Sequence, residues 1–379
     1  MNQIYFDNAA TTKPLDEILS TYEKVAKEYY GNASSIHFLG AEAFNLLNKA
    51  SEQILNNFSL NGYEVIFTSG ATEAINLAIK GYCLMHQNRG KHIITSVYEH
   101  PSVLESIKQL EENFGFIVTY LDIDSDGHID YEQLKNSITK ETILVAIMAV
   151  NNEIGSINDA RKIKELIKDK NKIVFFMDTT QAIGKIKLDY SLLDMFVVAG
   201  HKIHGLKGTG CLIKKRSIDL LPLNSGGGQQ ENLRSGTIDL PGAISLSRAI
   251  RLINQDLDNN FKKVVLLRDS LLSYLEDNKD HFEINSSYEN PYIINFSSKY
   301  HKASVIVEAL SRRGIYVSSI SACHSKKEKF SYVVDALKKD KKIAKNTIRV
   351  SFSYDNTVEE VEVLKEELHK IIGEIRDND

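Results

Sequence analysis

The sequence predicts an α/β fold in which helices cover a mostly parallel sheet, and three observations favour it. Short apolar runs rich in Ile, Val and Phe lie at 64–67, 92–95, 116–121, 143–150, 173–177 and 195–199. Most of these runs lack polar alternation, as is typical of strands that are buried on both faces. Segments with helical spacing separate the runs, at 73–86, 102–113 and 159–170. Such alternation of strands and helices indicates a parallel sheet with helices on its faces.

The second part of the chain has a different order of helical and strand-like segments. Beyond about residue 255, a helical stretch at 243–278 leads into strand-like runs at 292–297 and 347–352. The chain closes with an amphipathic helix, whose apolar stripe consists of Val361, Leu364, Leu368, Ile371 and Ile375. This pattern predicts a smaller α+β domain. We expect an N-terminal arm at 1–15, a large domain at 16–257 and a small C-terminal domain at 258–379.

Composition excludes several classes of protein. The 379 residues are 42% hydrophobic and 25% charged, which is ordinary for a globular chain and not for a disordered one. A net charge of −4 argues against a protein that coats nucleic acid or binds it stably. The three cysteines are far apart and include no CxxC pair, which argues against a disulfide framework or a zinc site. With no signal-peptide pattern and no membrane-spanning apolar stretch, we expect a cytoplasmic protein.

Small or chemically capable side chains follow five of the apolar runs, always at the same end. They lie at 68–73, 99–101, 151–155, 178–181 and 200–202. In parallel α/β sheets, ligands bind beyond the carboxyl ends of the strands, so we expect these segments to share one site.

Individual members of this set have both functional and ordinary interpretations. Asp178 ends a buried run, where its carboxylate needs a partner: a pyridinium N–H, a helix cap or a salt bridge. Lys202 lies between histidines after a strand, where a desolvated amine can be a nucleophile, although most lysines are simply solvated. His100 could stack on a cofactor ring or be a structural histidine. Segment 69–72 suits a phosphate at a helix N-terminus, or a plain N-cap.

Cys323 is the one cysteine in a context that favours chemistry. Small polar residues precede it and basic residues follow it, which indicates an exposed loop in which the thiolate is favoured. An inert surface thiol is the alternative. Cys83 and Cys211 lie in apolar helical and strand contexts, and we expect both in the core.

The segment 122–130 matches a calcium-binding loop through its ninth position. The twelfth position is Gln133, where a bidentate Glu is expected, and 116–121 reads as a strand rather than the entering helix. We interpret the segment as an acidic turn and expect no metal site. A non-catalytic, calcium-responsive module would use this loop with the basic stretches at 162–172 and 338–345, which we interpret as solvated helix faces.

Colinear motifs along most of the chain resemble one known family, the group I cysteine desulfurases. This family belongs to the class V aminotransferase branch of the fold-type I enzymes that depend on pyridoxal 5'-phosphate (PLP). The matching segments are DNAATT (7–12), NASSIHFLG (32–40), FTSGATEAINLAIKG (67–81), ITSVYEHPSVL (94–104), NNEIGS (151–156), DTTQAIGK (178–185), GHKIHGLKGTG (200–210), GGGQQENLRSGT (226–237) and SACHS (321–325). The resemblance implies a seven-stranded sheet in the large domain.

The resemblance also implies roles for individual residues. Lys202 would carry PLP and transfer protons, Asp178 would pair with the ring nitrogen, and His100 would stack on the ring. The phosphate would be held by Ala71, Thr72, His201 and, from the other subunit, Thr237, while Gln181 would contact the ring hydroxyl. Asn151 would contact substrate or cofactor. Arg349 would bind the substrate carboxylate, with Arg234 as a competing arginine.

Function and partners follow from the same resemblance. Cys323 would accept the sulfur of L-cysteine as a persulfide, leaving L-alanine. A homodimer would then deliver the sulfur to an iron–sulfur scaffold or a tRNA sulfurtransferase. The alternative is a selenocysteine lyase or another PLP-dependent C–S lyase. The sequence departs from the family pattern where Ala199 replaces a serine, His204 and Leu206 replace Tyr and Pro, Ile320 replaces a glycine, and Ala33 replaces a proline.

Overall fold

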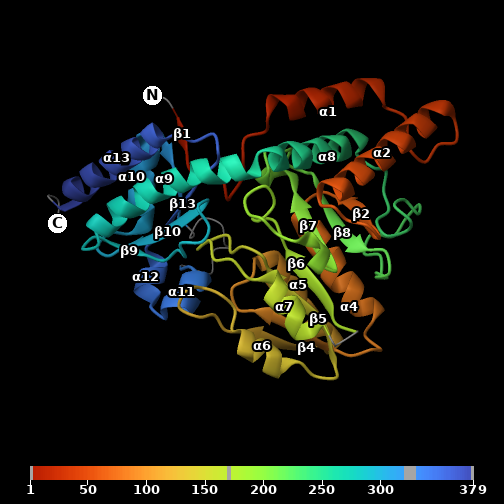
Figure 1. Cartoon of the computed structure of the whole chain (residues 1–379), viewed down its shortest axis with the longest axis horizontal. Helices are drawn as coiled ribbons and strands as arrows, with labels where there is room; N and C mark the ends of the chain where they lie inside the picture. Colours follow the sequence, from red (N-terminus) through yellow and green to blue (C-terminus); the bar gives the residue numbers. More distant parts are fainter. Residues whose placement is uncertain (1–2, 169–171, 320–329, 377–379) are drawn as a thin grey trace.

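A seven-stranded sheet dominates the computed structural model, which describes residues 3–168, 172–319 and 330–376 (Figure 1). The strand order is β2-β8-β7-β6-β5-β3-β4, where β8 is antiparallel to β2 and β7 and the other pairs are parallel. The strands are β2 (Tyr63–Thr68), β3 (His92–Ser96), β4 (Ile117–Leu121), β5 (Thr142–Met148), β6 (Val174–Asp178), β7 (Met195–Ala199) and β8 (Gly210–Lys215). The predicted mostly parallel, seven-stranded sheet is confirmed.

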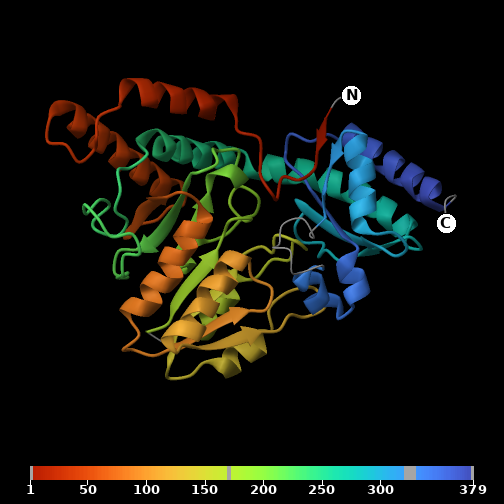
Figure 2. The ribbon, with the colours of Figure 1, turned by 180° about the vertical axis from the view of Figure 1, so that it is seen from behind.

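Helices cover both faces of this sheet, as Figures 1 and 2 show. The buried side chains of β6 alternate accordingly, because Phe175 and Met177 belong to one apolar cluster and Phe176 to another. The helices are α1 (Asp16–Glu28), α2 (Phe38–Asn57), α3 (Ala71–Asn76), α4 (Tyr82–Met85), α5 (Pro101–Phe114), α6 (Tyr131–Ser137), α7 (Ala160–Ile167) and α8 (Leu240–Gln255). A π-helical turn joins α3 to α4.

The C-terminal part of the chain forms a second sheet with its own apolar core. The strand order is β12-β13-β10-β9, and all its pairs are antiparallel. The elements are α9 (Leu257–Asp277), β9 (Phe282–Ile284), β10 (Ile293–Ser298), α10 (Ala303–Arg312), β11 (Ile315–Tyr316), β12 (Ser318–Ser319), α11 (Tyr332–Lys338), α12 (Lys341–Lys345), β13 (Thr347–Ser351) and α13 (Val358–Arg376). This confirms the predicted smaller α+β unit at the C-terminus.

Two details refine the expected domain organisation. The predicted helix at 243–278 is two helices, α8 and α9, which meet at Asp256 and run from the large sheet towards the C-terminal unit (Figure 1). The N-terminal strand β1 (Ile4–Tyr5) pairs with β11, and Phe6 is fully buried in the C-terminal core. The start of the arm thus packs with the last part of the chain, and the division at 257/258 stays a prediction.

The C-terminal helix α13 carries the apolar stripe that the sequence predicts. Val361, Leu364, Leu368 and Ile371 are all buried in the C-terminal core, whereas the burial of Ile375 lies outside the described part. No helix within the described ranges is long and apolar enough to cross a membrane.

Candidate active site

Four adjacent parallel strands of the large sheet end at one cavity of about 670 Å³. His100 follows β3, Asn152 and Glu153 follow β5, Asp178 ends β6, and Lys202 follows β7. These segments therefore share one site, as the sequence predicts. The cavity is also lined from outside the large sheet, by 9–11 of the N-terminal arm and by Arg349 of β13.

Lys202 lies on a short helical turn directly after β7. Its Nζ donates hydrogen bonds to the carbonyl oxygens of Ala9 and Ala10, each at 2.7 Å. The turn is tight at Gly200, where an added Cβ would lie 2.2 Å from the hydroxyl oxygen of Thr209. The local backbone therefore places the amine at the cavity wall, against the N-terminal arm.

Asp178 is a buried carboxylate that has no ion-pair partner among the described residues. It is 6% exposed, and its Oδ1 accepts a hydrogen bond from the backbone N–H of Thr180 at 3.0 Å. A buried carboxylate is costly unless a cation or several donors compensate its charge. A pyridinium N–H would supply that compensation, whereas Asp178 forms no salt bridge within the described residues and its observed bond to Thr180 is a local backbone contact.

His100 is the N-cap of α5 and lies at the cavity wall. Its Nδ1 accepts a hydrogen bond from the backbone N–H of Ser102 at 3.1 Å and lies 2.7 Å from the Ser102 hydroxyl oxygen. These contacts fix the orientation of the imidazole. The structural interpretation of His100 as a helix cap is therefore observed, and the cap also places the ring at the cavity, where stacking on a cofactor stays a prediction.

The segment that the sequence analysis suggests for a phosphate is the start of α3, and it lines the cavity. Gly70 has φ of 152°, a backbone conformation that favours glycine, and it turns the chain from β2 into the helix. Ala71 and Thr72 then form the first helical turn, where backbone N–H groups have no acceptor within the helix. His201 also lines the cavity, and burial together with nearby lysines lowers its pKa to about 4, so its imidazole is neutral.

Arg349 is the arginine that reaches the cavity, and it is only 5% exposed. One terminal nitrogen donates to the carbonyl oxygen of Asn152 and the other to Oδ1 of Asp7, both at 2.9 Å. Its Nε is buried and has no hydrogen-bond partner among the described residues. The competing Arg234 instead binds Glu73, with Nε 2.7 Å from the carboxylate, and lines a separate, smaller cavity.

Two predicted residues do not line this cavity, and a third lies outside the described part of the chain. Asn151 is fully buried, and its amide donates to the Tyr98 carbonyl and accepts from the backbone N–H groups of Glu153 and Ile154, so it stabilises the turn after β5. Thr237 lines the smaller cavity with Arg234. Cys323 lies outside the described residues, and its predicted role stays a prediction.

Sequence reasoning gave no individual role to several residues that line the cavity, among them Asn152 and Glu153 of the predicted segment 151–155, and it did not mention Lys207. Glu153 accepts a hydrogen bond from the Ser331 hydroxyl, and burial raises its pKa to about 7. The arm residues 9–11 lie in the DNAATT segment, which contributed to the resemblance but was given no role. The signal for the arm was therefore present, whereas nothing in the sequence placed Lys207 at the cavity.

The departures from the family pattern have separate structural settings. Ala199 lines the cavity without a hydroxyl, although Thr72 and Ser69 supply hydroxyls to the same cavity. His204 is buried, with Nδ1 3.0 Å from the Lys13 carbonyl and Nε2 3.1 Å from the Ser353 hydroxyl, so it joins the arm to the C-terminal unit. The Leu206 carbonyl accepts a hydrogen bond from the Thr209 hydroxyl. Ala33 lines a third cavity, and Ile320 lies outside the described residues.

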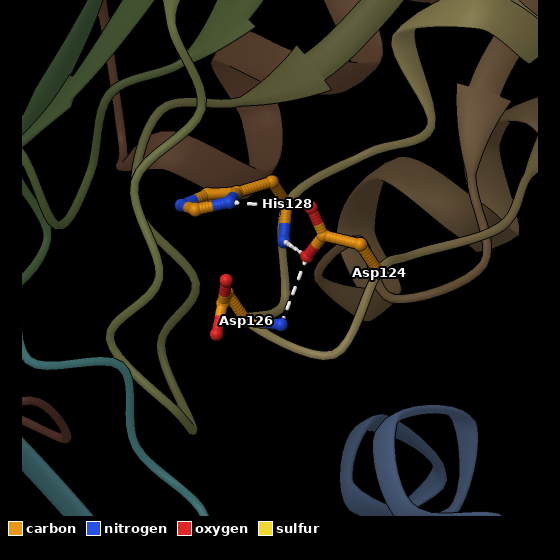
Figure 3. A group of neighbouring side chains, drawn as sticks. All are labelled: Asp124, Asp126 and His128. Atoms are coloured by element: carbon orange, nitrogen blue, oxygen red, sulfur yellow. Dashed lines mark hydrogen bonds and ion pairs between the residues drawn. The ribbon is translucent and has the colours of Figure 1, made fainter.

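The acidic loop after β4 is shown in Figure 3. Ligand atoms of Asp124, Asp126 and His128 lie within 4.8 Å of one another. However, Oδ1 of Asp124 accepts the backbone N–H groups of Asp126 and His128, each at 2.9 Å, which is the arrangement of a tight acidic turn. Gln133 uses its side-chain oxygen to accept from the backbone N–H of Asp122. The entering segment is the strand β4, as predicted, and the loop has the geometry of a turn.

Comparisons with known proteins agree with this arrangement. The class-V aminotransferase family model matches residues 4–364. A NifS/IcsS protein homolog of Lactobacillus delbrueckii subsp. bulgaricus is 40% identical, covering 95% of this chain and 94% of that protein. The cysteine desulfurase IscS of Proteus mirabilis is 38% identical, over 99% and 94%. A solved NifS-like protein superposes with a TM-score of 0.91 at 33% identity, covering 98% of this chain and 100% of that one.

The fold is therefore that of the fold-type I PLP-dependent enzymes. Within that class, the chain belongs to the class-V aminotransferase family, in the branch of the group I cysteine desulfurases.

Proposed function

We propose that this protein is a PLP-dependent cysteine desulfurase that uses Cys323 as its sulfur acceptor. In the overall reaction, L-cysteine and the Cys323 thiol give L-alanine and a persulfide on Cys323. The observation that carries the proposal is one cavity lined by Lys202, by the buried Asp178, which has no ion-pair partner among the described residues, by the helix-capping His100 and by the start of α3.

The residues present fit PLP. The buried Asp178 carboxylate suits the ring nitrogen, the first turn of α3 suits the phosphate, and Lys202 suits the covalent attachment. The neutral His201 adds a hydrogen-bonding side chain at the phosphate end without a second charge. PLP, when bound, serves as an electron sink for the substrate carbons.

The chain's own side chains would divide the remaining work. Arg349 would bind the carboxylate of L-cysteine through its planar guanidinium. Lys202 would move the proton that leaves Cα, and His100 would assist proton transfer at the substrate. The Cys323 thiolate would attack the substrate sulfur: an S–S bond forms, the C–S bond breaks, and its electron pair goes to Cβ. Protonation of Cβ then gives the methyl group of alanine.

The test is a product assay with a matched variant. Purified protein, PLP and L-cysteine with a thiol reductant are expected to give equal amounts of alanine and sulfide. Cys323→Ala is expected to lose both products while it still binds PLP, and Cys83→Ala, which removes a fully buried thiol, serves as the control. If Cys323→Ala turns over L-cysteine at the wild-type rate, a selenocysteine lyase or another C–S lyase becomes the better assignment. No alanine from wild type refutes the proposal.

We also propose that the protein is a homodimer. Large apolar side chains are exposed around the α1–α2 connection, with exposed fractions of 74% for Tyr30, 104% for Ile36 and 73% for Phe38. Such a patch is typical of a protein interface. Thr237, which lies outside this chain's main cavity, would then serve the partner's site. Light scattering during gel filtration tests this, and a mass of one chain at micromolar concentration would contradict it.

Delivery of the sulfur is the last part of the proposal. The acceptor would be an iron–sulfur scaffold or a tRNA sulfurtransferase in the cytoplasm, and the IscS name of the relatives supports the first of these acceptors. Persulfide labelled with radioactive sulfur from L-cysteine should move to a purified acceptor of one of these two classes. Retention of the label on the enzyme with both classes would contradict this part.

A further inference from the structure

Lys185 carries a buried amine to which the proposed mechanism gives no role. It is 6% exposed and follows the tight turn after β6. No carboxylate of the described residues forms an ion pair with it. Its hydrogen bond goes instead to the side-chain carbonyl oxygen of Gln181, at 2.6 Å. Burial of an amine without a carboxylate partner is destabilising. The hydrogen bond from Lys185 to Gln181 therefore needs an explanation.

The Lys185 amine is buried and lies near other positively charged side chains, and both features lower its pKa. Burial, together with the charges of Lys202 and Arg349, lowers the pKa of Lys185 to about 7. Lys185 in turn lowers the pKa of His201 and His204. His201, Lys202 and Arg349 line the cavity, so Lys185 lies close to the candidate active site without lining it.

Two contacts, with Lys185 and with Ala9, determine which way the Gln181 amide points. The amide oxygen accepts from Lys185, and Nε2 donates to the Ala9 carbonyl at 2.9 Å. A primary amide has two N–H donors, so one N–H remains after the bond to Ala9. Gln181 lines the cavity next to Asp178, where that N–H can meet a ligand. Without the Lys185 donor, only the contact with the Ala9 carbonyl would hold the amide in this orientation.

We infer that Lys185 is a positioning residue for PLP, which holds the Gln181 amide with its N–H towards the ring hydroxyl and places a cation behind it. This inference rests on the proposed function, because it concerns the cofactor that the proposed reaction requires. Lys185 touches neither substrate nor cofactor in this arrangement and acts through Gln181.

The test measures PLP affinity and the visible absorbance of the bound cofactor, neither of which requires turnover. Lys185→Met keeps the length of the side chain but removes the donor and the cation. Loss of one buried hydrogen bond should weaken PLP binding by roughly fivefold. Lys185 is protonated only below its pKa of about 7, so its removal should raise the midpoint of an absorbance change in this acid range by about half a pH unit or more. Lys187→Met, which removes an exposed lysine paired with Asp258, is the matched control and should change neither value.

Two further variants separate positioning from a general structural effect. Lys185→Gln keeps an N–H donor but no cation, so PLP affinity should stay within about twofold of wild type while the midpoint still rises. It also keeps the test available if Lys185→Met does not fold. In a Gln181→Ala background, Lys185→Met should weaken PLP binding no further, because the two side chains act as one unit.

The outcomes distinguish this inference from the proposed function. If wild type binds no PLP, the proposed function fails, and the Lys185 inference fails with it. If wild type binds PLP and forms alanine, but Lys185→Met matches Lys187→Met in affinity and midpoint, only the inference is overturned. Additive losses in the Gln181→Ala background would likewise overturn it, because Lys185 would then act independently of the amide.

Discussion

Replacement of Arg349 by leucine is the sharpest test of how the site recognises its substrate. The guanidinium is nearly buried at the cavity, and its hydrogen bonds to Asp7 and to the Asn152 carbonyl hold it in one orientation. We expect it to form charge-assisted hydrogen bonds with the carboxylate of L-cysteine. Each such bond contributes about 1.5–3 kcal/mol.

The expected size of the effect follows from these contacts. Asp7 already shares the positive charge of Arg349, so we take the lower value for two bonds, about 3 kcal/mol in total. Arg349→Leu should therefore lower kcat/KM for L-cysteine roughly 100-fold. Cysteamine is L-cysteine without its carboxylate, and its kcat/KM should change by less than about threefold in the same variant, because it makes no contact that the substitution removes.

The assay compares alanine formation from L-cysteine and ethylamine formation from cysteamine, with sulfide measured for both. Arg234→Leu is the matched control, because Arg234 pairs with Glu73 beside a different cavity. It should leave the ratio of the two kcat/KM values unchanged. The reasoning is refuted if Arg349→Leu slows both substrates equally, or if Arg234→Leu is the variant that changes the ratio.

Three further predictions concern buried polar groups. Asp178→Asn should weaken PLP binding at least tenfold, measured by absorbance titration, because a neutral amide cannot compensate a pyridinium charge; unchanged affinity would contradict the assignment. Asn151→Ala should lower the free energy of unfolding by about 2 kcal/mol in urea denaturation, since two buried N–H groups lose their acceptor. The PLP affinity of this variant should be little changed. If Asn151 binds the cofactor instead, PLP affinity should fall while the free energy of unfolding changes little. Glu99 is fully buried, and burial raises its pKa from 4.5 to about 8. Between pH 4.5 and pH 8 the folded protein therefore binds more protons than the unfolded chain. The free energy of unfolding should fall as the pH rises through this range, by up to about 1.4 kcal/mol per pH unit. Glu99→Gln should remove that part of the slope, and an unaltered pH profile would show that Glu99 is ionised as usual.

Much of the site could be predicted because parallel sheets place successive strand ends at one edge. His100, Asp178 and Lys202 follow strands whose apolar runs are readable in the sequence, so their meeting required only the topology. The strand β8 was absent from those runs, because its sequence begins with glycine and ends with two lysines. Its reversed direction likewise depends on pairing between distant segments, which local patterns do not report.

The parts that sequence patterns did not provide depend on side-chain orientation and on long-range contacts. Asn151 and Asn152 are adjacent, yet the first stabilises a turn while the second lines the cavity. Lys185 ends a segment that contributed to the resemblance, but only its burial and its bond to Gln181 distinguish it from a solvated lysine. Choosing between such neighbours requires knowledge of which way each side chain points.

The N-terminal arm connects the two parts of the candidate site, one on the large sheet and one on the C-terminal unit. Ser351, two residues after Arg349 on β13, accepts a hydrogen bond from the backbone N–H of Ala9 at 2.8 Å. The Ala9 carbonyl in turn accepts from both Gln181 and Lys202. One strand of the C-terminal unit therefore fixes the carboxylate-binding arginine and, through the arm, the groups around the proposed cofactor. Since Phe6 is buried in the same core, a shift of the C-terminal unit would move the arm with it, so loss of that core should impair PLP binding before the large sheet unfolds.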